Sequence, residues 1–555
     1  MARTQLFGML KQCAAMAWSA ERAGITTDLQ MERLWAMQPL QRRDIFRASL
    51  RMAMTTAVSL AGCGSARTNN VSRMGTKMCI AIVGAGLAGL HCAYRLLQAG
   101  VVAHVYEASN RVGGRICTAR GVFANGQIAE LGGEFINANH TCMRRLAHEF
   151  DLRLDDHGID APPGLCGDRF YFDGCLIAEH ELVEAFRPVA RQMARMAATT
   201  EADAEAFARV DAMNIVEWLD GLPEASDLLK RILTIAYTNE YGLEADEQSV
   251  FNLLSLIDFE TPNPFRIFGD SDERYQIHGG NDTLIMRLAA AVAGQIETDA
   301  RLVAVTSLAD GRYRLTFARS ATSFERDVDH VVFALPFTLL REVGLRIALP
   351  EDKTRVIRAL GYGTHAKLLG QFTSRVWHVR HQSNGSIITD NGLQSLYDAS
   401  HHQDGDTGVL INFLGGCAGM QSGRGTAEAQ MRAALPRIDA LFPGTAAAYI
   451  AASAVRMHWP TAPFTLGSYA VYRPGQTSFQ GMEGARVGNL HFCGEHCSVD
   501  FQGFMEGACE TSARVATALL NDLKRPSAGI ARLLGSRPLP RSSLRPDARR
   551  RLQQR

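Results

Sequence analysis

The 555-residue sequence has little net charge, few cysteines for its length and no evident internal repeat. Its 58 basic and 57 acidic side chains leave a formal charge of +1, so bulk charge gives no reason to expect a nucleic-acid partner. Twelve cysteines in a chain of this length do not make a disulfide scaffold. With 46% apolar and 21% charged residues, the composition is that of an ordinary globular protein with room for two or three domains.

The segment from Met78 to Arg115 predicts a strand, a glycine turn, a helix and a second strand. An apolar run leads directly into Gly84-Ala85-Gly86-Leu87-Ala88-Gly89, and apolar residues then recur at helical spacing. Gly84 would permit the tight turn, Gly86 would let the backbone approach a pyrophosphate, and Gly89 would let the helix pack on the strand. Leu87 and Ala88 open the helix, whose free N–H groups would face the phosphates. The pattern favours a dinucleotide site over a purely structural glycine turn.

An acidic residue completes this pattern. Glu107 lies 18 residues past Gly89, at the end of the second strand and beside Ala108. A carboxylate there is placed to accept the adenosine ribose hydroxyls, and it would repel a 2′-phosphate, which argues against NADP. The motif alone does not distinguish FAD from NAD.

Four further motifs follow Glu107 along the chain. They are Arg111-Val112-Gly113-Gly114-Arg115, Glu130-Leu131-Gly132-Gly133-Glu134, the run from Asn489 to Glu495, and the run from Asp500 to Ala508. Together they resemble the flavin-dependent amine oxidase family, which includes monoamine oxidases, polyamine oxidases, L-amino-acid oxidases and tryptophan 2-monooxygenases. The resemblance covers roughly Lys77 to Leu523. It implies an α/β fold, in which a Rossmann-type FAD-binding domain is interleaved with an α+β substrate domain made of a mixed sheet and a helical subdomain.

The implied domains alternate along the chain. Residues 77–155, 272–345 and 455–523 are assigned to the FAD-binding domain, and residues 156–271 and 346–454 to the substrate domain. Apolar spacing predicts helices over 141–154, 181–219, 231–241, 249–257 and 284–292, and a buried strand over 331–335. Residues 1–76 are expected to be a mostly disordered leader, and residues 524–555 a basic disordered tail.

The leader has two features of an export signal. Gln41-Arg42-Arg43-Asp44-Ile45-Phe46 resembles a twin-arginine signal, and Leu60-Ala61-Gly62-Cys63 resembles a lipoprotein cleavage box with Cys63 as a lipid anchor. The apolar stretch over 52–62 is too short for an ordinary spanning helix. We therefore expect a protein that is exported to the periplasm or anchored by lipid, and a cytoplasmic one if the leader is not a signal. The long preface over 1–40 leaves the true start open.

The resemblance implies FAD-dependent oxidation of a primary or secondary amine. In that reaction a hydride moves from the amine α-carbon to flavin N5, and O2 is reduced to H2O2. Lys367 aligns with the family lysine that holds a water against N5; the alternative is a surface lysine on a strand. Tyr469 and Phe504 match the aromatic pair that flanks the substrate amine. These three residues are the implied catalytic set.

Other positions are implied to hold the cofactor. The implied cofactor-binding residues are Gly84, Gly86, Leu87, Ala88, Gly89, Glu107, Ala108, Gly114, Arg115, Gly132, Gly133, Glu134, Val303, Glu495, Phe504 and Met505. Val303 would contact adenine through its backbone, Glu495 would bind the ribityl chain or pyrophosphate, and the helix starting near Met505 would face the flavin N1 and O2 edge. Ser468 stands where monoamine oxidases carry the cysteine bonded to flavin, so FAD is expected to be non-covalent.

His491, Cys493, His496 and Cys497 could suggest a metal site, but their spacing fits no standard zinc pattern. No metal is expected, because the flavin motifs account for the same segment. The sequence also has no convincing Ser-His-Asp set or carboxylate pair.

The substrate class is less settled. L-amino-acid oxidases and tryptophan 2-monooxygenases bind a carboxylate, usually with an arginine in a Gly-Ala-Met-Arg-like pattern. Here that place reads Gly132-Gly133-Glu134-Phe135, and an acid there would suit the second ammonium of a diamine. Arg144, Arg266 or Arg375 could still supply a carboxylate partner from elsewhere. A non-catalytic flavoprotein is a third alternative, and the sequence does not indicate the oligomeric state.

Overall fold

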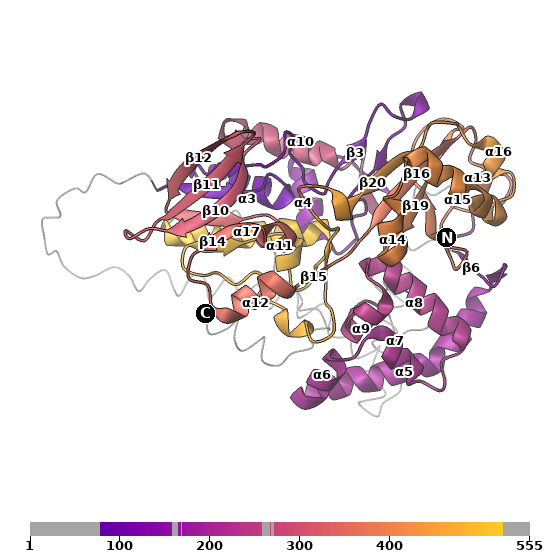
Figure 1. Ribbon diagram of the computed structural model, residues 1–555. Coiled ribbons are helices and arrows are strands. Elements are labelled where there is room, and N and C mark those ends of the chain that lie inside the picture. The colour runs from indigo at the N-terminus through magenta and orange to yellow at the C-terminus, as the bar shows by residue number, and fades with distance from the viewer. Residues whose placement is uncertain (1–77, 158–164, 168, 258–266, 268–270, 526–555) are drawn as a thin grey trace, which may run out of the picture. The chain divides into compact units, whose positions relative to one another are not determined.

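The computed structural model describes residues 78–157, 165–167, 169–257, 267 and 271–525 (Figure 1). The described residues belong to one compact unit. The twin-arginine motif, Cys63 and the basic tail beyond Arg525 lie outside them, so the expectations about export, lipid anchoring and disorder stay predictions. Within the described part of the chain, no helix combines the length and the apolar character that a membrane span requires.

A five-stranded parallel sheet contains the predicted glycine motif. Its order is β22 (Leu490–Phe492), β13 (His330–Phe333), β1 (Ile80–Val83), β2 (His104–Tyr106) and β9 (Ile296–Glu297). The central strands are buried on both faces, as their apolar sequences predict. This parallel sheet confirms the predicted α/β fold. Its strands come from three separate stretches of the chain, so motifs that are distant in the sequence meet in one sheet.

Four helices belong to the same layered unit. They are α3 (Leu87–Gln98), α4 (Thr141–Glu149), α10 (Asp282–Ala291) and α17 (Met505–Asp522). Leu90 and Leu96 of α3 share one buried cluster with Leu519 and Leu520 of α17. The prediction that the helix over 141–154 continues to Leu154 is wrong. The helix ends at Glu149, and Leu154 begins β5 (Leu154–Asp156), which pairs with β8 (Tyr275–Ile277).

A four-stranded sheet has the order β12 (Thr322–Val328), β11 (Tyr313–Arg319), β10 (Arg301–Ser307) and β14 (Gly344–Arg346). The register between β10 and β11 shifts between Leu302 and Ala304, so Val303 is the extra residue of a β-bulge. Val303 is therefore not paired with a residue of β11, which leaves its backbone free of that strand pairing, as a contact to adenine would need. The adenine contact itself stays a prediction.

A seven-stranded mixed sheet forms the second large sheet. Its order is β20 (Val455–His458), β16 (Ala366–Phe372), β19 (Gly408–Leu414), β18 (Gln394–Asp398), β17 (Ile387–Thr389), β6 (Arg169–Phe172) and β7 (Cys175–Ile177). β20 pairs with β16, although the predicted boundary placed residues from 455 onward in the FAD-binding domain. That boundary falls one strand too early, and the other boundaries stay predictions.

A group of helices precedes β8 in the chain and is seen together in Figure 1. It comprises α5 (Glu179–Ala202), α6 (Ala204–Asp211), α7 (Ile215–Asp220), α8 (Asp227–Tyr241) and α9 (Val250–Leu256). The single helix predicted over 181–219 is wrong, because two capping residues divide it. Asp203 accepts a hydrogen bond from the Glu205 N–H, and Asn214 forms a capping box with Glu217.

Shorter elements connect these layers. The paired short strands are β3 (Thr118–Ala119) with β4 (Ala129–Glu130), and β15 (Gly361–Tyr362) with β21 (Ala470–Val471). The remaining helices are α11 (Phe337–Leu340), α12 (Glu351–Ala359), α13 (Val376–Val379), α14 (Gly416–Ser422), α15 (Ala427–Leu441) and α16 (Thr445–Ala448).

Candidate active site

Two glycines of the first motif are needed for close packing of the backbone. Gly84 has φ +105°, and its N–H donates to the Tyr106 carbonyl at 2.7 Å. A Cβ at Gly84 would lie 2.7 Å from the Ala334 carbonyl oxygen, and a Cβ at Gly89 would lie 1.9 Å from the Gly84 carbonyl oxygen. A larger residue at Gly89 would push α3 away from the end of β1, and one at Gly84 would clash with the segment that follows β13.

Gly86 is required for a different reason. It is the N-terminal cap of α3, and a Cβ built on it would meet no protein atom closer than 4.0 Å, where Gly113 O and Gly114 Cα lie. The space in front of this backbone is therefore left open by the protein. Leu87 and Ala88 begin α3 there, and the first N–H groups of a helix have no intrahelical acceptor. The turn therefore fits a bound pyrophosphate.

Glu107 lies against this turn. One carboxylate oxygen accepts the Ala85 N–H at 2.8 Å, and the other accepts the Ser109 N–H at 3.0 Å and the Ser109 hydroxyl at 2.9 Å. The side chain is thus fixed at the end of β2, next to Ala108. Its role as acceptor for ribose hydroxyls stays a prediction.

Arg115 and Glu495 join two motifs that are 380 residues apart. Their ion pair measures 2.7 Å between Nη1 and Oε1. Glu495 also accepts the Gly503 N–H at 2.8 Å and the Ala470 N–H at 3.3 Å. The contacts of Glu495 within the protein therefore hold three other segments together, and its predicted contact with the ribityl chain or pyrophosphate would come in addition to them.

The paired glycines after Leu131 allow several segments to meet. A Cβ at Gly132 would lie 1.9 Å from the Arg115 carbonyl oxygen, and a Cβ at Gly133 would lie 3.0 Å from Cγ and Sδ of Met505. The indole N–H of Trp459 donates to the Leu131 carbonyl at 3.1 Å. The start of α17 is therefore packed directly against this glycine pair.

Lys367 and Glu134 form a buried ion pair, with 2.6 Å between Nζ and Oε2 and 6% exposure of each side chain. Nζ also donates to the carbonyls of Glu130 and Gly132, at 3.1 and 3.0 Å. The Tyr397 hydroxyl donates to the same Glu134 oxygen at 2.8 Å. Lys367 is thus not a surface lysine.

This pair corrects the expectation that Glu134 offers an acid to a second substrate ammonium. Its negative charge is already balanced by Lys367 and further stabilised by Tyr397. Bringing a second cation to a carboxylate that already has a buried cationic partner gains much less than the bare sequence motif indicates.

Tyr469 lies in a stack of three rings. It stacks on His365 with 4.6 Å between ring centroids, and His365 stacks on Phe413 with 4.7 Å and an interplanar angle of 2°. His365 Nε2 lies 2.8 Å from the Asn239 carbonyl, and Nδ1 lies 2.6 Å from the Ser468 hydroxyl oxygen. Because the carbonyl can only accept, Nε2 carries the proton and Nδ1 accepts the Ser468 hydroxyl.

His365 was not among the predicted site residues, although it lies two residues before Lys367. Burial lowers the pKa of His365 to about 4, so the imidazole is neutral at pH 7. The only signal in the sequence was a polar residue directly before the apolar strand that begins at Ala366, and that pattern does not indicate ring stacking.

Phe504 is the N-terminal cap of α17, and its ring packs on His140 with 5.1 Å between centroids. Tyr469 lies beside the adjacent Gly503, where a Cβ would lie 3.3 Å from Cδ2 of the tyrosine. Tyr469 and Phe504 are thus both neighbours of Gly503. Their predicted role in flanking an amine stays a prediction.

Glu240 is an acidic residue near Tyr469 that the sequence analysis did not consider. The Tyr469 hydroxyl donates to the Glu240 carbonyl, and the Glu240 carboxylate raises the pKa of Tyr469 further, after burial. Burial raises the pKa of Glu240 itself to about 7. An acid in such an environment is stabilised in its charged form by any cation that reaches it.

Two of the three arginines considered for a substrate carboxylate, Arg144 and Arg375, have partners within the protein. Arg144 donates to the Ala138 carbonyl at 2.7 Å and lies over the Tyr275 ring. Arg375 donates to the Gln403 carbonyl at 2.5 Å. Arg266 lies outside the described residues.

Comparison with known proteins identifies the family. Residues 87–520 match the model of the family described as flavin containing amine oxidoreductase. This chain belongs to that family. It is therefore an enzyme, an oxidoreductase, and its family implies a flavin cofactor. The glycine turn around Gly86, the segment around Gly133 and the start of α17 are the parts of this amine oxidoreductase that could hold one.

Named relatives fall into two substrate groups. The chain is 24% identical over 469 residues to an L-amino-acid oxidase of Siganus canaliculatus, covering 79% of this chain and 84% of that one. It is 21% identical over 479 residues to amine oxidase A of Sus scrofa, covering 83% and 88%.

Solved structures with the same fold include two amine oxidases. Putrescine oxidase bound to putrescine superposes with a TM-score of 0.68 at 20% identity, covering 80% of this chain and 99% of that one. Cyclohexylamine oxidase from Brevibacterium oxydans IH-35A superposes with a TM-score of 0.68 at 21% identity, covering 81% and 100%. At this identity the likeness establishes the fold.

Proposed function

We propose that the protein is an FAD-dependent oxidase of primary or secondary amines, with FAD bound non-covalently. Bound flavin would supply the two-electron oxidation of the carbon next to the amine, with O2 as final acceptor and H2O2 as product. The open backbone at Gly86 supports a dinucleotide, and Glu107 suits the ribose of FAD. Ser468 supports non-covalent binding, because a serine cannot form a thioether and His365 already accepts its hydroxyl hydrogen.

The surroundings of Tyr469 favour an amine over an amino acid as the substrate. The wall formed by Tyr469, His365 and Phe413 is aromatic and, with a neutral imidazole, uncharged. Glu240 is one of the acids that act on Tyr469, and its carboxylate would attract a substrate ammonium and repel a substrate carboxylate. An apolar amine therefore fits this environment better than an α-amino acid.

Lys367 would act beside the flavin as a cation whose hydrogen bonds are already in place. Its Nζ is held by Glu134 and two carbonyls, so its position is fixed before any substrate binds. A fixed cation of this kind can stabilise negative charge that develops on a neighbouring group during oxidation. Tyr469 and Phe504, both neighbours of Gly503, would orient the amine.

A panel of matched pairs tests the proposal. Tyramine, tryptamine and putrescine are compared with tyrosine, tryptophan and ornithine in a peroxide-release assay. An unpartnered carboxylate costs several kcal/mol to desolvate, so we expect each amine to exceed its amino acid by about a hundredfold or more in kcat/KM. Acid denaturation should release the flavin into the supernatant, where chromatography should identify it as FAD.

The second candidate is an L-amino-acid oxidase or a tryptophan 2-monooxygenase, and the named L-amino-acid oxidase relatives favour it. Preference for an amino acid in the same panel would establish that candidate. Flavin that stays with the acid precipitate would contradict non-covalent binding.

A further inference from the structure

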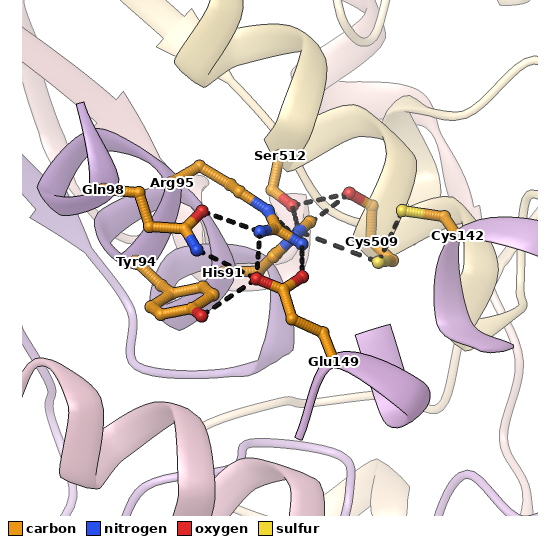
Figure 2. Close-up of polar contacts among 8 residues, drawn as sticks. All are labelled: His91, Tyr94, Arg95, Gln98, Cys142, Glu149, Cys509 and Ser512. Atoms are coloured by element: carbon orange, nitrogen blue, oxygen red, sulfur yellow. Dashed lines mark hydrogen bonds and ion pairs between the residues drawn. The ribbon is translucent and has the colours of Figure 1, made fainter. Parts of the chain in front are cut away.

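Cys142 and Cys509 bring their sulfur atoms together at a buried junction of three helices, α3, α4 and α17 (Figure 2). Cys142 is the second residue of α4, and Cys509 is the fifth residue of α17. Their Sγ atoms lie 2.7 Å apart, and both cysteines are free thiols. The residues are 2% and 0% exposed, so solvent does not separate them.

A metal ion is the first alternative for this cluster, because His91 lies beside the two thiols. Arg95 excludes it by fixing the state of the imidazole. The Arg95 Nε–H donates to His91 Nε2 at 2.8 Å, and a guanidinium has no acceptor, so Nε2 must offer its lone pair. The proton of the neutral ring is then on Nδ1, the nitrogen that lies 3.7 Å from Cys509 Sγ.

The contacts of Nδ1 agree with this protonation. Nδ1 lies 3.0 Å from the Cys509 carbonyl and 2.8 Å from the Ser512 hydroxyl oxygen. Burial lowers the pKa of His91 to about 3, so the ring is neutral. Arg95 is itself held by Glu149, through two hydrogen bonds of 2.8 and 2.7 Å (Figure 2). A nitrogen that carries a proton and donates it cannot bind a metal, and the described residues then offer the two thiols no third ligand in this group.

We propose that Cys142 and Cys509 are a redox-active pair that forms a disulfide between α4 and α17. In the reaction with hydrogen peroxide, one thiol attacks an oxygen, becomes a sulfenic acid and releases water. The second thiol then displaces the hydroxyl group as a second water, and the S–S bond forms. The two sulfurs together lose two electrons and two protons, and one peroxide is reduced to two waters.

The cross-link would fix the start of α17. Glu506 already connects the same two helices, because its carboxylate accepts the N–H groups of Cys142 and Met143 at 2.9 and 2.8 Å. Met505, the first residue of α17, contacts the Gly133 segment. A disulfide at Cys509, one helical turn further on, would hold this end of α17 against α4 when the pair is oxidised. The inference goes beyond the proposed function and does not depend on turnover.

Alkylation and mass spectrometry test the pair directly. The full-length holoprotein is treated with hydrogen peroxide, denatured in N-ethylmaleimide without reductant, and digested. We expect a cross-linked peptide that contains Cys142 and Cys509, two hydrogens lighter than the sum of the two free peptides. Cys497 is an internal control, since it is equally buried but its Sγ contacts the Glu483 carbonyl, and it should carry the maleimide. Maleimide on both Cys142 and Cys509 after peroxide treatment would overturn the proposal.

Thermal melting gives an independent measurement. A cross-link that closes a loop of several hundred residues stabilises a protein of this size by roughly 3–5 °C in Tm. The oxidised wild type should lose that amount when a phosphine reductant is added. Cys142→Ser should show no reductant-dependent shift, whereas Cys497→Ser should keep it. A Tm that is identical with and without reductant in the wild type, or zinc retained at one equivalent with no cross-link, would count against the disulfide.

Discussion

Lys367 donates to Glu134 across 233 residues of sequence, and both side chains are buried where the glycine pair at 132–133 meets β16. Breaking a buried ion pair leaves one charge without compensation, which costs about 3–5 kcal/mol. We expect Glu134→Gln and Lys367→Met each to lower the free energy of unfolding by that amount in urea titrations. The double variant should lose at least about 1 kcal/mol less than the sum of the two single losses. Strict additivity would mean that the two charges do not interact.

A variant of Lys367 distinguishes its role in the flavin reaction from its role in stability. Lys367→Met should keep its flavin, yet slow the reoxidation of reduced flavin by about a hundredfold in stopped-flow measurements, because the fixed cation is gone. Lys353→Met is a matched control, since Lys353 is also buried and also donates to two carbonyls, those of Met482 and Glu483. Equal slowing in both variants would show a general effect of structural damage.

Flavin loading depends on the open backbone at Gly86. Gly86→Val should prevent flavin binding, because its side chain would occupy the space that the protein leaves free there. The measurement is the flavin-to-protein absorbance ratio after purification. Gly294→Ala is the control, because a Cβ at Gly294 meets no atom within 4 Å and Gly294 lies in a short helical turn away from the motif. Normal flavin content in Gly86→Val would place the pyrophosphate elsewhere.

Glu240 should affect substrates according to their charge. When a neutral amide replaces the Glu240 carboxylate, a diamine loses an attractive partner for its ammonium groups. A monoamine with an apolar tail loses less binding energy. Glu240→Gln should therefore raise KM for putrescine about tenfold or more, which corresponds to about 1.4 kcal/mol, and change KM for tyramine less. The corresponding change at Glu134 should lower stability without altering this ratio. A constant putrescine-to-tyramine ratio in Glu240→Gln would remove Glu240 from the substrate site.

The stacked imidazole of His365 should make stability fall in mild acid. Its pKa is lowered from 6.5 to about 4 by burial, so the unfolded chain takes up a proton below pH 6.5 while the folded protein does not until about pH 4. Over this window His365 should cost the folded state up to about 3 kcal/mol. His365→Gln removes that contribution. We expect the stability advantage of the wild type over this variant to shrink as the pH falls from 7 to 4 in urea titrations; an advantage that stays constant would mean that His365 titrates normally.

The sequence by itself determined the first strand–helix–strand unit of the parallel sheet. The apolar run over 80–83, the glycines at 84, 86 and 89 and the acid at 107 predict β1, α3 and the end of β2, because buried strands, tight turns and helix packing leave a local pattern in the sequence. Helix boundaries were predicted less well where helix-forming composition and capping residues occur in the same segment. The segment over 181–219 has helical composition throughout, yet the caps at Asp203 and Asn214 divide it into three helices.

Only the tertiary structure decided which side chains share a site. The Lys367–Glu134 pair, the Tyr469–His365–Phe413 stack and the Cys142–Cys509 contact each join residues that are tens to hundreds of positions apart. Periodicity shows which face of a strand or helix is buried, but it carries no information on which distant segment covers that face. The arrangement of the two large sheets decides which segments meet. It brings Lys367 to Glu134, so the acid expected to bind substrate is instead the buried partner of a lysine.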